Sequence, residues 1–142
     1  MQVQREIVID APLERVWDLI TRAEHIKTWY AFDGAEIDLR PGGGIEHFWR
    51  EHGRYRGVIV EVVPPERFAY WYSNVPDADP EPGKRTRVEF TLTSVPGGTL
   101  VRVTESGLED LTLSGEERQA YLDATTQGWA GGLAGLAEKA AA

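Results

Sequence analysis

The sequence predicts an α+β protein in which a curled antiparallel β-sheet wraps around one long C-terminal α-helix. Three observations lead to this prediction. Two short helical segments follow the first strand, strand-like alternation then runs from residue 35 to residue 103, and an amphipathic segment begins near residue 114. The connections are short, which favours an up-and-down sheet whose twist curls it around the last helix. A gap between such a sheet and its helix is a natural place for a pocket.

The first strand and the two short helices are predicted within residues 3–29. Apolar side chains in residues 3–9 share one side of an extended chain. Pro12 suits the first turn of a helix, where its missing N–H leaves no hydrogen bond unmade. A second helix is expected from residue 23 to about residue 29, with Ile26 and Trp29 three residues apart. The apolar stripe of the first helix includes Val16, Trp17, Leu19 and Ile20.

About six further strands are predicted between residues 35 and 105. In one of them Val88, Phe90 and Leu92 alternate with polar residues, which is typical of an antiparallel strand buried on one face. The segment 74–84, rich in proline and acidic residues, is expected to be a polar loop between strands. The expected strands are residues 35–39, 45–50, 55–63, 68–73, 87–94 and 99–105.

The C-terminal helix is predicted to begin at Ser114, because Ser114 and Glu117 match a capping box. Each glycine inside a helix costs roughly 1 kcal/mol relative to alanine. Packing must therefore hold this helix, and its small residues either bring it close to the sheet or leave space beside it. The glycines are Gly128, Gly131, Gly132 and Gly135, and the predicted inner face holds Tyr121, Leu122, Thr125, Trp129, Leu133 and Leu136.

The composition narrows the kinds of partner. The chain has 142 residues, with 15 Lys and Arg against 23 Asp and Glu, so its formal charge is −8. The basic residues are scattered, and nucleic acid is therefore not an expected partner. The sequence has no cysteine, which excludes disulfides and thiolate metal sites. Because the first residues carry charges inside their apolar run and no apolar stretch approaches ~20 residues, we expect a soluble cytoplasmic protein without a membrane span.

Several motifs occur in order along the chain, in residues 7–21, 26–29, 38–43, 57–70, 98–99 and 128–129. Together they resemble the START/Bet v 1-like (SRPBCC) superfamily, and within it the proteins similar to the activator of heat-shock protein 90 ATPase. The resemblance implies a helix-grip fold, the sheet-around-helix arrangement described above, as a single domain over residues 1–142. Superfamily members bind lipids or polyketides, catalyse cyclisations, sequester toxic metabolites or assist a chaperone, so the resemblance leaves the function open.

The run Arg40-Pro-Gly-Gly-Gly44 raises the question of a phosphate-binding loop. Such a loop needs a helix N-terminus directly after the glycines. Here the alternating residues Ile45, His47 and Trp49 follow, and no Gly-Lys-Ser/Thr motif is present. The glycines therefore predict a hairpin turn with positive φ, and the alternating residues are expected to form one wall of a cavity.

His47 and Glu105 are the two polar residues expected to face inward. A histidine at this place could bind a ligand or act as a general base, and equally it could be a core histidine satisfied by a neighbour. A His47–Glu105 pair would form a polar centre in an apolar cavity. A zinc site from Glu46, His47, Glu51 and His52 is not expected, because neighbours on a strand point to opposite faces. We expect neither a metal nor a cofactor.

Three functions follow from these observations together with the resemblance, which implies the second and the third. The first is binding of a small hydrophobic or aromatic molecule without intrinsic catalysis, by a monomer or homodimer. The second is a polyketide cyclase/dehydratase-like enzyme with His47 as acid/base, with Glu105 or Tyr70 as further candidates. The third is a module that modulates a chaperone. The expected pocket residues are Trp29, Ile45, His47, Trp49, Tyr70, Tyr72, Phe90, Val101, Val103, Glu105, Tyr121, Trp129 and Leu133.

Overall fold

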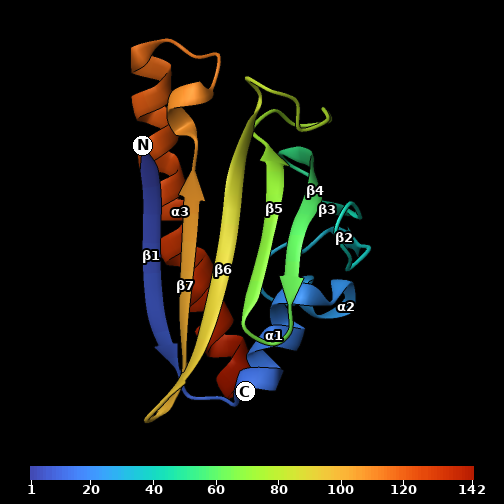
Figure 1. Cartoon of the computed structure of the whole chain (residues 1–142), viewed down its shortest axis with the longest axis vertical. Helices are drawn as coiled ribbons and strands as arrows, with labels where there is room; N and C mark the ends of the chain where they lie inside the picture. Colours follow the sequence, from blue (N-terminus) through green and yellow to red (C-terminus); the bar gives the residue numbers. More distant parts are fainter.

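A computed structural model describes residues 1–142 and has a seven-stranded antiparallel sheet with the strand order β1-β7-β6-β5-β4-β3-β2 (Figure 1). Neighbouring strands in the chain are neighbours in the sheet except where β1 pairs with β7. This is the predicted up-and-down arrangement, and the α+β prediction is confirmed. The strands are β1 Gln2–Ile9, β2 Gly34–Ile37, β3 Gly44–Trp49, β4 Gly53–Val63, β5 Arg67–Ser73, β6 Arg85–Val95 and β7 Gly98–Ser106.

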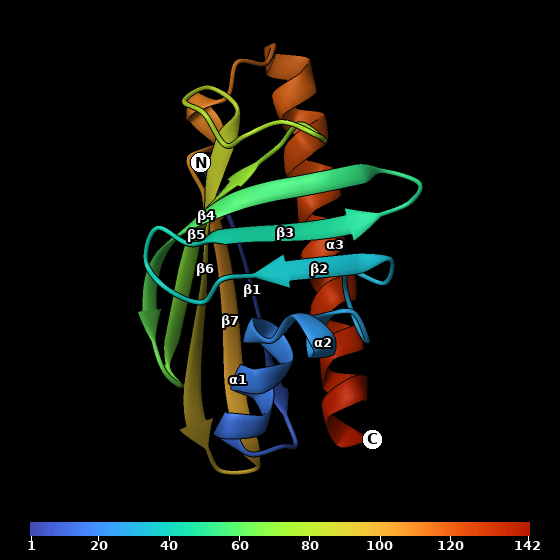
Figure 2. The same ribbon diagram turned by 90° about the vertical axis from the view of Figure 1, so that its right-hand side faces the viewer.

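The long helix α3 (Gly115–Ala141) lies against the inner face of the curled sheet. Figure 2 shows strands β2, β3 and β4 crossing in front of α3, while β1, β7 and β6 run nearly along it. Helices α1 (Leu13–Thr21) and α2 (Ala23–Ile26) connect β1 to β2, and a short 3₁₀ helix, η1 (Leu108–Asp110), precedes α3. The sheet therefore curls around its last helix as the sequence predicts.

Helix α2 is shorter than predicted, because it ends at Ile26 and not near Trp29. Beyond Ile26 the chain turns, and the amide of Ala31 donates to the carbonyl of Ile26. The buried indole of Trp29 donates through Nε1 to the carbonyl of Leu19 over 2.7 Å. This contact satisfies a carbonyl in the last turn of α1 and holds the turn against that helix.

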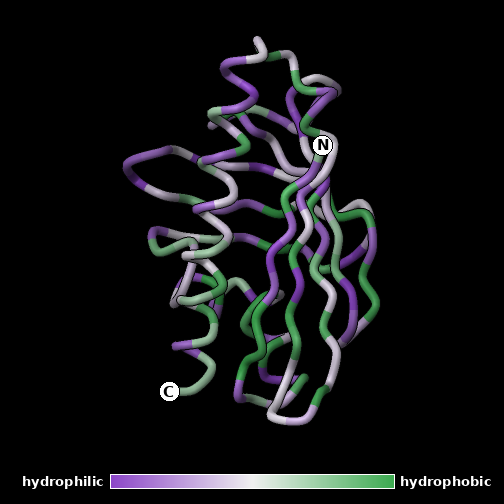
Figure 3. The backbone as a smooth tube through the Cα atoms, turned by 90° about the vertical axis from the view of Figure 1, so that its left-hand side faces the viewer, coloured by the Kyte–Doolittle hydropathy of each residue, from purple (hydrophilic) through white to green (hydrophobic).

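Alternation along the strands produces the core. Figure 3 shows hydrophobic and hydrophilic residues alternating along the strands. Tyr70, Val88 and Val101 point inward and are at most 2% exposed, whereas the outward residues of the same strands are largely polar. Each such side chain contributes roughly 1.5–3 kcal/mol to folding when it is fully buried. Burial of this inner face is what holds α3 in place despite its glycines.

The start of α3 is held by two sets of hydrogen bonds. The predicted capping box is present: the Ser114 hydroxyl accepts from the Glu117 amide over 3.1 Å, and the Glu117 carboxylate accepts from the Ser114 amide over 2.9 Å. The Arg118 guanidinium donates to the carbonyls of Leu108, Leu111 and Leu113. The first turn of α3 is thereby tied to η1 and the segment after it.

The glycine run forms the predicted turn before β3. Gly42 has φ +84°, a conformation that side chains disfavour. At Gly43 a Cβ atom would lie 2.0 Å from the carbonyl oxygen of Asp38. The turn packs against β4, since the Gly42 amide donates to Ile59 and the Ile59 amide donates to Gly43. These glycines serve the backbone, and a strand follows them where a phosphate loop would need a helix.

Candidate functional site

A cleft of about 460 Å³ lies between the inner face of the sheet and α3. Its mouth is marked by His52, Ala124 and Gly128, which line the cleft and are exposed to solvent. Volumes of roughly 300–1,000 Å³ are usual for small-molecule sites. The lining residues are Tyr30, Trp49, His52, Tyr55, Tyr72, Ser73, Asn74, Glu105, Tyr121, Ala124, Thr125, Gly128 and Trp129.

Two periodicities bring these residues to one place. On the sheet, Trp49, Tyr55 and Tyr72 point inward from β3, β4 and β5, because side chains alternate along each strand. On α3, Tyr121, Thr125 and Gly128 follow one another at helical spacing and share a face. The cleft is the space left where this helix face and these strands diverge.

Gly128 contributes to that space directly. A Cβ atom built at Gly128 would meet no atom within 4 Å. At Gly132 a Cβ atom would lie 3.6 Å from the Tyr30 ring, and at Gly135 it would lie 3.4 Å from the Trp29 carbonyl oxygen. The two explanations offered for the glycines therefore apply to different parts of α3. Gly128 leaves space, and Gly132 and Gly135 lie where the helix approaches other atoms.

Most of the wall of the cleft consists of aromatic rings, each of which contacts the next. Tyr30 stacks on Trp129 with ring centres 5.7 Å apart and an interplanar angle of 7°. Tyr30 also meets Trp49 edge to face at 5.0 Å, and Trp49 meets Tyr55 edge to face at 5.8 Å. Tyr55 in turn stacks on Tyr72 at 6.2 Å. The contacts between rings orient the wall, and they stabilise it beyond the area that the rings bury.

Glu105 is the carboxylate of the cleft and is only 3% exposed. Its Oε2 atom accepts hydrogen bonds from the hydroxyls of Thr86 and Tyr121, each over 2.7 Å. Its Oε1 atom accepts from the indole Nε1 of Trp129 over 2.9 Å. All three donors are uncharged side chains. The buried charge is thus solvated by neutral dipoles from β6 and α3.

The tyrosines around Glu105 are held in their neutral form. Burial raises the pKa of Tyr121 far above its ordinary value, and the nearby Glu105 charge and their shared hydrogen bond add to the shift. Burial also raises the pKa of Tyr30, again with a contribution from Glu105. The pKa of Tyr72 is likewise raised, mainly by burial. These hydroxyls therefore act as hydrogen-bonding groups in the cleft and not as phenolates.

His47 lies behind the cleft, in the closed core. It is 1% exposed, and its Nδ1 lies 2.8 Å from the hydroxyl of Tyr72. Its Nε2 is buried without a hydrogen-bond partner. Burial lowers the pKa of His47 to about 3, so the ring is neutral near pH 7. Tyr30, Trp49 and Tyr72 line the cleft and also contact the His47 ring.

The structure divides the expected pocket residues into two groups. Of the residues on β3 that were expected to form a cavity wall, Trp49 reaches the cleft, while Ile45 and His47 lie in the core beside it. The anticipated pair between His47 and Glu105 is not formed, because each group has its own partners. The cleft takes Trp49, Tyr72, Glu105, Tyr121 and Trp129, and the closed core takes Trp29, Ile45, His47, Tyr70, Phe90, Val101, Val103 and Leu133.

Sequence reasoning missed several lining residues. Tyr55 carried a usable signal, since it begins an alternation with Gly57 and Ile59 that places it on the inner face. Tyr30 carried none, because it lies in an irregular segment between α2 and β2. Thr125 was expected on the inner face of the helix, although not as a pocket residue. The other lining residues that were missed lie at or just beyond strand ends or on α3, namely His52, Ser73, Asn74, Ala124 and Gly128.

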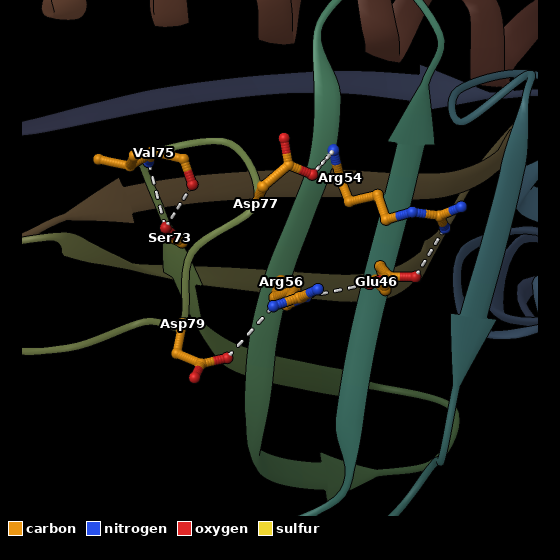
Figure 4. A network of polar contacts seen from close by, with 7 residues as sticks. All are labelled: Glu46, Arg54, Arg56, Ser73, Val75, Asp77 and Asp79. Atoms are coloured by element: carbon orange, nitrogen blue, oxygen red, sulfur yellow. Dashed lines mark hydrogen bonds and ion pairs between the residues drawn. The ribbon is translucent and has the colours of Figure 1, made fainter.

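A second hollow of about 610 Å³ lies on the outer face of β3 and β4, beside the loop 74–84. Glu46 accepts hydrogen bonds there from Arg54 and Arg56, each over 3.2 Å, and Arg56 lies 3.8 Å from Asp79 (Figure 4). The carboxylate of Asp77 also accepts from the backbone amide of Arg54 over 3.3 Å. These charges pair with one another and tie the loop to the sheet, so the inner cleft is the better candidate for a ligand site.

Two further observations concern other kinds of site. No three His, Cys, Asp or Glu side chains come together in a way that could hold a metal ion. None of the helices combines the length and the apolar character needed to span a membrane.

Comparisons with known proteins agree with this architecture. A family described as "Activator of Hsp90 ATPase homolog 1-like protein" matches residues 10–141. Among solved structures, a protein from Mesorhizobium loti is 23% identical, with a TM-score of 0.79 over 97% of this chain and 95% of that one. The Aha1 dimer from Colwellia psychrerythraea is 18% identical, with a TM-score of 0.78 over 99% and 96%. An AHSA1-like protein from Aeromonas hydrophila is 22% identical, with a TM-score of 0.71 over 97% and 90%. No curated protein matches this chain.

Proposed function

We propose that this chain, which belongs to the family of activator of Hsp90 ATPase homolog 1-like proteins in the START/Bet v 1-like (SRPBCC) superfamily, binds a small hydrophobic or aromatic molecule. The ligand occupies the cleft between the sheet and α3. The observation that carries the proposal is the cleft of about 460 Å³ walled by contiguous aromatic rings. Such rings bind a flat apolar molecule by burying its surface, and the few polar groups among them set its orientation.

Binding without catalysis is the form of the proposal that the site favours. A general base must reach the substrate proton and hold a suitable pKa. His47 does not line the cleft, and burial lowers its pKa to about 3. The tyrosines that line the cleft have pKa values raised by burial. A cyclase mechanism with His47 as acid/base is therefore the less favoured alternative.

A substitution at Gly128 tests whether the cleft is the binding site. A leucine side chain at this position extends into the open space of the cleft. Leucine also stabilises the helix by roughly 1 kcal/mol relative to glycine. Gly131→Leu is the matched control, because Gly131 lies on the same helix, faces open space and does not line the cleft. A loss of binding in the first variant alone is then due to the blocked cleft and not to unfolding.

Native mass spectrometry of the protein purified from its own host provides the readout. We expect a retained small molecule in the wild type and in Gly131→Leu, and its loss in Gly128→Leu. A panel of aromatic and aliphatic ligands should likewise raise the melting temperature of the first two proteins only. The proposal fails if no ligand in the panel stabilises the wild type and no molecule is retained.

The family description and one relative bear on macromolecular partners. The family is described by its likeness to an activator of the Hsp90 ATPase, and modulation of a chaperone is the third hypothesis for this chain. The Colwellia relative is described as a dimer. Light scattering on the purified chain, with and without ligand, distinguishes a monomer from a homodimer.

A further inference from the structure

The cleft contains a carboxylate but no lysine or arginine side chain to balance its charge. No lysine or arginine is among the lining residues, and Glu105 is the one carboxylate there. Its hydrogen-bond donors are neutral, and it takes part in no ion pair. The imidazole of His52 is at the exposed mouth. The interior of the cleft thus holds a negative charge without a cation to balance it.

Building on the proposed binding function, we propose that the ligand is a hydrophobic cation, an ammonium compound with an aromatic or alkyl body. The ammonium group pairs with Glu105, and the apolar body lies among the rings. An opposite charge is what a buried carboxylate lacks when only neutral donors surround it.

The aromatic wall supports the same ligand class. Aromatic faces carry partial negative charge and attract ammonium groups, most strongly where water is excluded. Trp49, Tyr55 and Tyr72 form a continuous series of rings on the sheet. Tyr30, from the segment before β2, joins this series to Trp129 on α3. Trp129 belongs to both features, because its ring is part of the wall and its N–H donates to Glu105. The rings and the carboxylate therefore act on the same ligand.

Glu105 has hydrogen-bond acceptor capacity that the protein itself does not use. Glu105 Oε1 receives one hydrogen bond, from Trp129, although a carboxylate oxygen can accept two. An ammonium group has donors and no acceptors, and so it complements this oxygen. A carboxylate or phenolate ligand would instead place a second negative charge near Glu105.

Three probes that share one ring system and differ in charge test the inference. They are 1-naphthylmethylamine, 1-naphthalenemethanol and 1-naphthoate, titrated into the full-length protein by calorimetry at about pH 8, where the amine is protonated. For the wild type we expect the amine to bind at least about tenfold more tightly than the alcohol. The naphthoate should bind more weakly than the alcohol.

Two variants locate the effect. Glu105→Gln keeps the shape and removes the charge, so we expect the amine and the alcohol to bind it about equally. Glu138→Gln removes the same charge from an exposed site on α3 that does not line the cleft, and this control should keep the preference for the amine.

The outcomes separate this inference from the proposed function. If the alcohol binds the wild type as tightly as the amine, the cation inference is overturned and binding in the cleft stands. If the preference for the amine persists in Glu105→Gln, Glu105 is not its source and the inference is again overturned. If none of the probes binds and the wider panel also fails, the proposed function falls, and this inference falls with it. The wild-type comparison decides the charge preference even where Glu105→Gln is unstable.

Discussion

The Nε1 atom of Trp129 donates a hydrogen bond to Oε1 of Glu105 over 2.9 Å, and this bond joins the last helix to the last strand at the cleft. Both residues also make other contacts. Trp129 also packs edge to face on Phe90 at 5.5 Å, and Glu105 also accepts bonds from Thr86 and Tyr121. The contact between α3 and the sheet is therefore polar where Trp129 meets Glu105 and apolar where Trp129 meets Phe90.

Replacing Trp129 with phenylalanine tests this connection. The phenyl ring retains part of the packing, while the carboxylate loses a donor in a buried place. Hydrogen bonds to charged groups contribute about 1.5–3 kcal/mol, so we expect the free energy of unfolding to fall by about that amount. Urea denaturation measures it. Trp71→Phe, on the outer face, is the control, and an equal loss in both variants would contradict the role given to Glu105.

Removing the Tyr72 hydroxyl isolates the bond to His47. In Tyr72→Phe both ring nitrogens of His47 become unpaired in the core, which should lower the free energy of unfolding by about 1–3 kcal/mol. Tyr55→Phe is a close control, since Tyr55 stacks on Tyr72 and its hydroxyl makes no hydrogen bond within the protein. It should change stability by less than about 0.5 kcal/mol. Equal effects of the two substitutions in urea denaturation would contradict this account.

His47 predicts how stability depends on pH. Its pKa is lowered from 6.5 to about 3 by burial, so in acid the unfolded chain takes up a proton that the folded chain does not. Its contribution is fully present above pH 6.5 and is lost as the pH falls towards 3, by up to about 1.4 kcal/mol per pH unit. The difference in unfolding free energy between wild type and His47→Gln should therefore shrink in acid. A difference independent of pH would show that His47 is not buried as described.

The ion pairs of Glu46 on the outer face of the sheet are expected to contribute little to stability. Glu46 accepts from Arg54 and Arg56 on the outer face of the sheet, where both guanidinium groups are partly exposed. Exposed ion pairs contribute about 0–1 kcal/mol, and Glu46→Gln should cost no more than that. It should leave the affinity of the cleft for naphthalene probes unchanged. A change in affinity comparable to that of Glu105→Gln would instead place the ligand on the outer face.

The sequence was sufficient for the order of the elements, because local patterns encode them. Alternation identified the inner faces of β3 and β6, and the Ser114–Glu117 pair identified the start of α3. The predicted length of α2 was too great, because Ile26 and Trp29 satisfy a helical spacing. Trp29 instead lies in a turn, where its indole donates a hydrogen bond to the carbonyl of Leu19. Periodicity reports which side of an element is buried, and it does not report where the element ends.

The sequence by itself determined that residues such as His47, Tyr72 and Glu105 point inward. Only the tertiary structure decided which inward residues meet a ligand. That choice depends on where α3 diverges from the sheet, and on Tyr30, which reaches the cleft from an irregular segment. His47 and Tyr72 lie on different strands at the same inner face, and yet one is enclosed and the other lines the cleft. Strand geometry sets the direction of a side chain, whereas packing between distant segments sets what lies in front of it.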